Sequence, residues 1–503
     1  MNDLKNNAKN NALSGLIFFI VNTLVALVLN PILVNYLGST YFGIWKSIDH
    51  FLGFASIADG KGSQALKWTI ANQEASNDLD KKRREVGSAL FVWFVFLPVL
   101  SGIVSLLIYF SPFLVKGIDE SEYNLVRFLV FLLGLNLIIT PLFGISESIL
   151  VGVNKGYIAN YVKLFWLIVS SFLMYVVLYS GYSIEELALV TLAITTFRGI
   201  HYFFICKHNV SWFNIKKPTK NDLSTFFKFS SWKLIWSFIA RFLMSSEIIF
   251  LSILVSATSV SQYIFTGYIA IVGITLSAIV SSAITPGLGR LIGNKEFGKS
   301  REIIKQLREL LLVTSFFIAA AMLLLNKSFV FLWAGEKLFL GDLNNILIAL
   351  LMIQLILIRN EAFLIDLSLN IKSKVMIGFV SVILSVVCSL VGYYYIWNNI
   401  SSIFIGIFLG RLIMLLLFPY LTNKMIHFQN RKQINFKLLT KIILFFISII
   451  YIGDIQLLET WFSLFSVGLI EVILVAIILY SFILSSKNKA LIYNKFIALK
   501  GRL

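Results

Sequence analysis

Charged residues are scarce in this sequence. They make up 14% of its 503 residues, whereas a water-soluble domain carries about 25%. Apolar residues make up 58%, and the mean hydropathy is +0.86. A chain so poor in charge cannot cover a water-exposed surface, so lipid must surround most of it. The sequence therefore predicts an integral membrane protein.

Cysteine and histidine are also rare. The two cysteines, Cys206 and Cys388, stand alone, and the four histidines are scattered along the chain. These numbers exclude a disulfide framework, and none of these residues has the spacing of a metal site. We therefore predict no metal, no cofactor and no catalytic residues.

Apolar segments long enough to cross a bilayer recur along the whole chain. About 20 apolar residues suffice for one crossing. Fourteen such crossings leave only about 200 residues for loops and tails, too few for a catalytic domain, so we do not expect an enzyme. The predicted fold class is all-α, a polytopic membrane protein of about 14 transmembrane helices. The segments lie near residues 12–35, 42–67, 88–110, 125–150, 157–180, 187–206, 229–255, 261–288, 307–332, 345–369, 375–396, 402–421, 438–456 and 461–484.

Lysine and arginine collect in alternate loops between these segments. The loops near residues 81–84, 290–308 and 424–441 are basic, while the opposite loops are mostly acidic. Basic loops face the cytoplasm, so we expect both termini there. The net charge of +18 would suggest nucleic acid in a soluble chain. Here it lies on the inner face, where anionic membrane lipids attract it, and we expect no nucleic-acid partner.

The order of the segments indicates an internal duplication. Residues 32–74 align loosely with residues 253–296, and both stretches lead into a basic loop and a further span. Parallel repeats of this kind usually flank a central substrate site in transporters. We therefore expect an N-terminal six-helix lobe at 1–207, a cytoplasmic linker at 208–228, a second six-helix lobe at 229–424, and two additional helices with a basic tail at 425–503.

Ionisable residues lie inside several predicted spans. A charge at the bilayer centre costs about 2.5 to 3.5 kcal/mol on the insertion scale, so these residues must pair or line a wet cavity. In the span 42–67, one face of an ideal helix carries a polar stripe of Lys46, Asp49, His50, Gly53, Gly60, Lys61, Gln64 and Lys67. We predict a cationic cavity, which suits an anionic group such as a pyrophosphate. The candidate binding residues are Lys46, His50, Arg198, Arg241, Arg359 and Arg411.

The acidic residues within spans admit two roles. Glu147, Glu247, Glu361 and Asp366 are candidates for binding a coupling proton or sodium ion, because a buried carboxyl can hold a proton near neutral pH. They could equally be counter-ions of lysine and arginine. For Arg359 and Asp366, which share one helix face, a structural ion pair is the alternative. The sequence leaves both roles open.

Residues 293–300, GNKEFGKS, satisfy the pattern G-x-x-x-x-G-K-[ST] of a P-loop. That pattern binds phosphate only between a buried strand and a helix of an α/β domain. Here it lies in a short basic loop after a membrane span. We interpret the match as a coincidence and expect no ATP binding.

One stretch near the N-terminus resembles a known family. Leu37-Gly38, the YFGIW run at 41–45, Asp59-Gly60 and the basic helix end at Lys67 look like the first hairpin of bacterial polysaccharide flippases. These are the O-antigen (Wzx-type) branch of the multidrug/oligosaccharidyl-lipid/polysaccharide (MOP) superfamily. The hydropathy resemblance covers the whole chain, while the sequence pattern covers mainly residues 13–75. Lys61-Gly62 departs from the pattern, because the family more often has apolar residues there.

The resemblance implies a function. Members of that family move undecaprenyl-pyrophosphate-linked oligosaccharides, the repeat units of O-antigen or capsule, from the cytoplasmic to the periplasmic leaflet by alternating access. It therefore implies a lipid-linked oligosaccharide as substrate, the bacterial inner membrane as location, and a glycan polymerase and chain-length proteins as further partners.

Three alternatives remain open. Fourteen spans also resemble the lipid II flippases of the same superfamily, but those carry arginine in the first helix, whereas residues 13–34 here are uncharged. A multidrug exporter of the superfamily would select cations with acidic residues. A membrane glycan polymerase, the enzymatic alternative, ordinarily needs a large outside loop, and the longest here is at 326–344.

Overall fold

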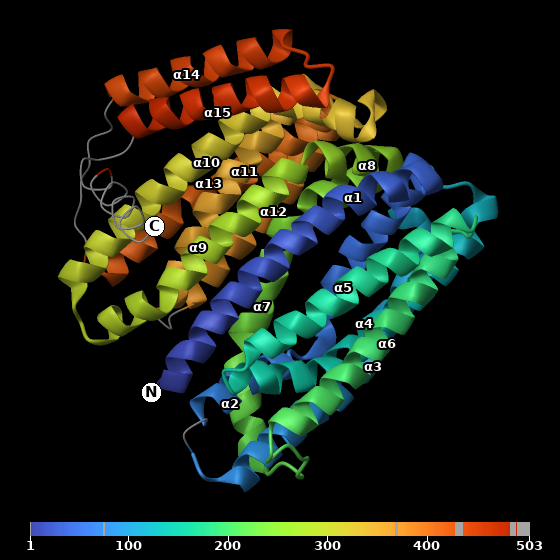
Figure 1. The fold of residues 1–503 in the computed structure, drawn as a ribbon, viewed down its shortest axis with the longest axis vertical. Coiled ribbons are helices and arrows are strands. Elements are labelled where there is room, and N and C mark those ends of the chain that lie inside the picture. The colour runs from blue at the N-terminus through green and yellow to red at the C-terminus, as the bar shows by residue number, and fades with distance from the viewer. Residues whose placement is uncertain (1, 74–75, 368–370, 428–435, 483–488, 490–503) are drawn as a thin grey trace. The chain divides into compact units, whose positions relative to one another are not determined.

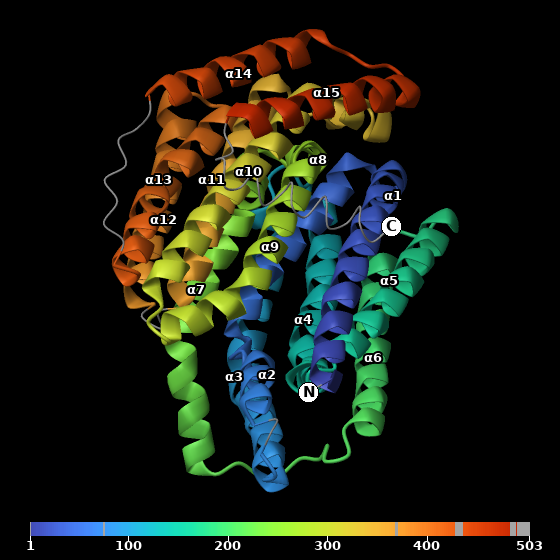
Figure 2. The ribbon, with the colours of Figure 1, turned by 60° about the vertical axis from the view of Figure 1, so that its left-hand side comes forward.

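The computed structural model describes residues 2–73, 76–367, 371–427, 436–482 and 489. Within these ranges the ordered elements are helices and turns of helix, with no strand, so the predicted all-α fold class is confirmed. The chain divides into two compact units, Met1–Ser261 and Gln262–Leu503. Figure 1 and Figure 2 show the helices in two views.

The described residues include 11 helices long and apolar enough to cross a membrane, or 12 if the bent pair α8 (Ala257–Thr266) and α9 (Tyr268–Gly293) is one span. Within the described residues, each predicted apolar segment overlaps at least one helix of the structure, and the segments 42–67 and 261–288 each cross a break between two helices. The predicted number is larger for two reasons. Two predicted segments share the long helix α1, and the segment 438–456 falls on α14 (Phe436–Ile455), whose first side chains lie outside the described part. A multi-pass membrane protein is confirmed.

The first unit begins with α1 (Asn2–Ala55), which consists of two helical arms that meet at Gly38. Gly38 has φ 79° and ψ 162°, a combination open essentially to glycine alone. The chain reverses direction there, and the second arm runs back toward the level of the N-terminus (Figures 1 and 2). One glycine thus separates the predicted spans 12–35 and 42–67.

The second arm does not continue as one helix to residue 67. A 3-10 turn covers Ser56–Asp59, Gly60 and Lys61 are both left-handed with φ of 72° and 51°, and α2 (Gly62–Asn72) follows. A Cβ on Gly60 would stand 2.6 Å from the Phe96 ring, so the packing of the turn on α3 (Leu79–Leu114) also requires glycine. The prediction of one polar stripe from Lys46 to Lys67 is therefore wrong beyond Gly53, because the helix is interrupted.

The other helices of the first unit pack through small residues. A Cβ on Gly134 would stand 2.4 Å from Val104, and one on Gly199 would stand 2.1 Å from the Phe143 ring. In lipid, apolar burial drives little helix association, so such close approach is what holds a bundle together. These helices are α3 (Leu79–Leu114), α4 (Tyr123–Gly152), α5 (Gly156–Tyr179), α6 (Ile184–Asn209) and α7 (Lys220–Phe250), which a π-turn extends over Leu251–Val255.

The second unit follows the same packing rule. A Cβ on Gly406 or Gly410 of α13 would stand 2.4 Å or 2.2 Å from the backbone of Ser389 or Ser385 on α12, so these two helices touch along their backbones. Its helices after α9 are α10 (Phe297–Ala334), α11 (Asp342–Asp366), α12 (Lys372–Val391) with a π-turn at Gly392–Ile396, α13 (Ile400–Met425), α14 and α15 (Trp461–Phe482).

Two sequence predictions concern the organisation of the chain. The P-loop pattern at 293–300 covers the last residue of α9, the connection after it and the first residues of α10, so a helix and not a strand precedes it. The lobes 1–207 and 229–424 were predicted from a sequence repeat. The structure does not test that repeat, so the lobes stay a prediction. By packing, the chain divides at Ser261, which places α7 in the first unit.

Candidate functional site

The second arm of α1 carries Lys46, Asp49 and His50 on one face, and Asp49 and His50 lie near α7. Lys46 Nζ lies 5.2 Å from the centroid of the Phe42 ring, within the range of a cation–π interaction. Asp49 interacts electrostatically with both Lys46 and Arg241 of α7. His50 Nδ1 lies 2.8 Å from the hydroxyl of Ser245, one turn beyond Arg241. Three predicted binding residues, Lys46, His50 and Arg241, are thus brought together within the first unit.

A glycine gives Arg241 its position. A Cβ on Gly53 would stand only 1.4 Å from Nη2 and 2.1 Å from Cζ of Arg241, so the guanidinium occupies the space above the glycine backbone. Gly53 follows His50 by one turn of the same arm. The polar face of the second arm therefore contacts a cation from another helix, Arg241. The sequence alone does not distinguish Gly53 from other glycines, so this contact could not be predicted.

A cavity of about 250 Å³ opens beside Lys46. It lies among the two arms of α1, α5 and α6, and its apolar wall includes Phe42, Trp45 and Met174. Its size admits several water molecules or a small polar group. The polar side chains that line it are one ammonium group and four neutral groups: Lys46, Asn22, Asn30, Ser170 and Ser171. Such a lining can bind an anion or a group rich in hydroxyls.

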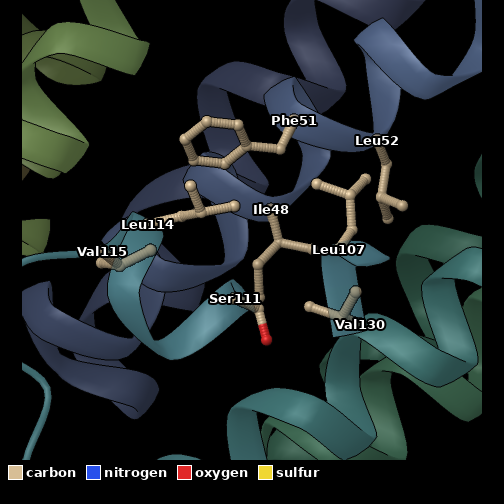
Figure 3. Close-up of a pocket in the computed structure, with 8 residues that line it drawn as sticks. All are labelled: Ile48, Phe51, Leu52, Leu107, Ser111, Leu114, Val115 and Val130. Atoms are coloured by element: carbon tan, nitrogen blue, oxygen red, sulfur yellow. The ribbon is translucent and has the colours of Figure 1, made fainter. Parts of the chain in front are cut away.

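The opposite side of the same arm is apolar. Ile48, Phe51 and Leu52 point toward α3 and α4 around a pocket of about 10 Å³, which has room for one water molecule at most (Figure 3). Ser111 lines this pocket, and its hydroxyl donates to the carbonyl of Ile108, so it is satisfied within its own helix. The arm is thus amphipathic inside the unit, and its charged face is the one that offers a binding surface.

The remaining cationic candidates lie elsewhere. Arg198 on α6 is half-buried and lies near Tyr202, on which it acts electrostatically. Arg359 on α11 and Arg411 on α13 belong to the second unit, where Arg359 is half-buried and Arg411 has no exposed surface. Their role in substrate binding stays a prediction.

Two candidate coupling carboxylates lie in the first unit. Glu147 Oε1 is 2.5 Å from Lys163 Nζ on the neighbouring helix α5. The sequence contained a signal for this pair, since the two residues lie near the facing ends of consecutive predicted spans. Glu247 on α7 is buried, and it accepts a hydrogen bond of 3.2 Å from the hydroxyl of Ser246.

The two carboxylates of the second unit are both ion-paired. Glu361 on α11 accepts hydrogen bonds from Nε and Nη2 of Arg308 at 2.6 and 2.7 Å, while Nη1 of Arg308 donates to Asn423 at 2.8 Å. Asp366 pairs with Lys374 of α12. The sequence predicted Arg308 to lie in a basic loop on the inner face. In the structure it lies within α10, which begins at Phe297. Glu147, Glu361 and Asp366 are thus each paired with a lysine or arginine, and their role in ion coupling stays a prediction.

No protein-family model and no curated protein matches this sequence. Solved structures do match. The lipid II flippase MurJ, in an inward closed conformation, superimposes with a TM-score of 0.65 at 14% identity, covering 96% of this chain and 99% of the flippase. An inward-facing MATE multidrug resistance transporter of the MOP superfamily gives 0.62 at 15% identity, covering 84% and 100%. Its outward-facing form gives 0.59 at 15% identity, covering 84% and 96%.

The chain has the fold of the MOP transporters. The flippase match leaves about 20 residues of this chain uncovered, while α14 and α15 have 20 and 22 residues, so the match includes at least part of this helix pair. The neighbours are transporters and a flippase, and none of these three is described as an enzyme. At 14 to 15% identity the likeness concerns the fold, and the substrate has to be argued from the site.

Proposed function

We propose that the protein is a flippase for a lipid-linked glycan. It would move an undecaprenyl-pyrophosphate-linked oligosaccharide, of O-antigen or capsule type, from the cytoplasmic to the periplasmic leaflet by alternating access. The observation that carries this proposal is the grouping of Lys46, His50 and Arg241 in a membrane-embedded unit, with Lys46 lining a cavity that also contains amide and hydroxyl side chains. The likeness to a lipid II flippase over 96% of the chain supports it.

The chemistry of the substrate fits this grouping. A pyrophosphate carries negative charge through the membrane, and an unpaired ion in a medium of low dielectric costs tens of kcal/mol in the idealised limit. The Lys46 ammonium and the Arg241 guanidinium offset that cost with charge-assisted hydrogen bonds. Asp49 balances these cations when no substrate is bound, since it interacts with both. The amides and hydroxyls of the cavity suit the hydroxyls of a sugar.

The polyprenyl chain of the substrate needs no site of this kind. Its apolar surface is as stable among lipid tails as against protein, so it remains in the bilayer while the head group crosses. We further propose that the protein lies in a bacterial inner membrane with both termini in the cytoplasm, as the basic loops indicate. A glycan polymerase and chain-length proteins are its proposed partners.

Two alternatives rest on the structural comparisons. A lipid II-type flippase would use the same pyrophosphate contacts with a different glycan, and the lipid II flippase match supports it. A multidrug exporter is supported by the likeness to MATE transporters. A cationic drug, however, would meet Lys46, Arg241 and a single carboxylate, Asp49, on the arm, so the charge of the site favours an anion.

Reconstitution tests the proposal. The full-length protein in liposomes should move undecaprenyl-pyrophosphate-linked oligosaccharide to the opposite leaflet, measured as accessibility of a labelled sugar to an added membrane-impermeant reagent. Lipid II and a cationic dye serve as competing substrates in separate vesicles. Movement of the dye alone would overturn the flippase, and movement of lipid II alone would reassign the glycan. The same assay in sodium-free and pH-clamped vesicles tests whether an ion drives transport.

A further inference from the structure

The break between α1 and α2 places several oxygen atoms around one ammonium group. Lys61 Nζ donates to the main-chain carbonyl of Ser56 at 2.7 Å and to Oδ2 of Asp59 at 3.4 Å, and it lies 3.3 Å from Oδ1 of the same carboxylate. The carboxylate also accepts a hydrogen bond of 2.8 Å from the main-chain N–H of Lys61. A single turn of chain supplies both the oxygens and the cation.

These oxygens lie where a membrane helix ends. α1 ends at Ala55 and the 3-10 turn Ser56–Asp59 follows directly, so the carbonyl of Ser56 lies at the end of a membrane helix, where the helix dipole adds negative charge. Interrupted membrane helices in transporters use such carbonyls and helix ends to coordinate monovalent cations. The side chains of Lys61 and Asp59 are only 18% and 13% exposed, so water screens their attraction weakly.

The backbone at Lys61 is in a conformation that lysine seldom adopts. Its φ of 51° and ψ of 28° are left-handed, which costs free energy for any residue with a Cβ and almost none for glycine. Glycines flank Lys61 at positions 60 and 62. If the turn required only this backbone conformation, a third glycine at position 61 would satisfy it at a lower cost. The side chain must therefore contribute something at this position, and its contacts with Ser56 and Asp59 are that contribution.

We propose that this turn is a binding site for a monovalent cation, and that the protein fills it permanently with the ammonium group of Lys61. The carboxylate of Asp59 supplies one negative charge and the Lys61 side chain one positive charge, as a sodium ion would. Because the cation is attached to the chain, the helix break keeps its structure at any sodium concentration. This site then cannot couple transport to a sodium gradient.

Loss of the ammonium group should open the site. In Lys61→Gly the carboxylate of Asp59 and the carbonyl of Ser56 lack their cation, while the left-handed backbone is relieved of strain, so the variant is expected to fold. A sodium ion with bound water should then enter and stabilise the folded state. Lys61→Ala tests the same loss with the backbone cost retained.

The measurement is the thermal unfolding of the full-length protein in detergent, in sodium chloride and in choline chloride of equal ionic strength. The wild-type Tm should be equal in the two salts. For Lys61→Gly the Tm should be higher in sodium by about 2 to 4 °C, and the rise should saturate with concentration. Potassium chloride in a third series shows whether the site prefers one of the two ions.

Two controls make the result specific. Lys67→Ala removes an exposed lysine from α2 and should leave the Tm equal in both salts. Asp59→Asn combined with Lys61→Gly removes the carboxylate and should abolish the sodium response. The proposal is overturned if Lys61→Gly unfolds at the same temperature in sodium and choline, or if the double variant keeps the response. Neither result depends on which substrate is transported, so the flippase proposal is tested separately.

Discussion

Gly53 on α1 lies directly beneath the guanidinium of Arg241 on α7, so close that a Cβ on the glycine would stand 1.4 Å from Nη2. The Arg241 side chain thus fills space that a side chain at position 53 would otherwise occupy, although the two helices are far apart in sequence. The position of the cation in the site depends on the absence of atoms at Gly53. This relationship leads to a sharper test of the site than removal of the charge itself.

Gly53→Ala should impair transport although it removes no functional group. The added methyl must displace the end of a flexible side chain, so the protein should still insert and fold, but the guanidinium leaves its place beside Asp49 and His50. Loss of one charge-assisted contact with the substrate should lower the transport rate about tenfold or more. The liposome assay measures it, with Gly102→Ala as control, since a Cβ there meets no described atom within 4 Å. Equal rates for the two variants would show that Arg241 does not act from this position.

Lys46→Ala should impair transport without loss of insertion. Its ammonium group lines the cavity beside neutral amides and hydroxyls, and its removal leaves no cation in that lining. Binding of a pyrophosphate group should weaken by about tenfold or more. Lys46→Arg should keep part of the activity, because the positive charge remains. Lys67→Ala on α2 is the matched control, and normal transport by Lys46→Ala would remove the cavity from the proposed pathway.

Glu361→Gln should lower stability and leave any ion dependence of transport unchanged. Glu361 is 4% exposed and accepts two hydrogen bonds from Arg308, so loss of its charge leaves the guanidinium without its counter-ion, a change worth about 3 to 5 kcal/mol in buried pairs. Thermal unfolding measures the effect. Arg308→Met combined with Glu361→Leu should be less destabilising than Glu361→Gln alone.

A different outcome would support the coupling role of Glu361. If Glu361→Gln unfolds at the wild-type temperature but transports independently of an ion to which the wild type responds, then the carboxylate binds that ion. Asp366→Asn offers a comparison, because Asp366 pairs with Lys374 of α12. This variant should likewise lower the Tm and leave any ion dependence of transport unchanged.

The membrane-spanning segments were predictable because length and apolar composition alone define them. Each predicted segment overlaps at least one helix within the described residues, since a single apolar segment of about twenty residues in lipid can satisfy its own backbone hydrogen bonds only as a helix. The reversal at Gly38 separates two of these segments as expected. The interruption at 56–61 was not predicted, because hydropathy is insensitive to two left-handed residues within an otherwise helical pattern.

The candidate site was predictable in part. Helical periodicity placed Lys46 and His50 on one helix face. The free-energy cost of a charged side chain in the bilayer indicated that Arg241 must face the protein interior. The partners of the carboxylates were harder to find. Arg308 sits near a predicted span end and reads as a loop residue, and its pairing with Glu361 depends on how α10 and α11 pack. The position of Arg241 over Gly53 depends on a contact between helices almost 200 residues apart, for which a single sequence contains no signal.

The connection between α6 and α7 gives a prediction that depends on pH. Thr219 and Asp222 form a capping box at the start of α7, and Arg84 of α3 lies 3.3 Å from the Asp222 carboxylate. Partial burial opposes ionisation of this carboxyl, but hydrogen bonds from Thr219 and the charge of Arg84 outweigh it, so the pKa of Asp222 lies below its usual range. A lowered pKa in the folded state means that the ionised carboxylate stabilises the cap at neutral pH. This stabilisation is present above the ordinary pKa of aspartate, near 4, and is lost as the pH falls through the lower folded value.

Amide hydrogen exchange at residues 220–223 should therefore report an acid-sensitive cap. Protection, corrected for the intrinsic exchange rate at each pH, should stay constant from about pH 7 to pH 5 and fall at lower pH as Asp222 takes up a proton. Asp222→Asn keeps a side chain that can accept from the backbone but has no charge to lose, so its protection should be lower at neutral pH and independent of pH over the same range. The capping box at Ser183 and Glu186 of α6 provides an internal comparison, because an exposed cap without an arginine partner in its described surroundings should respond more weakly. Constant protection in the wild type down to pH 3 would mean that contacts other than those of the ionised Asp222 hold this end of α7 in place.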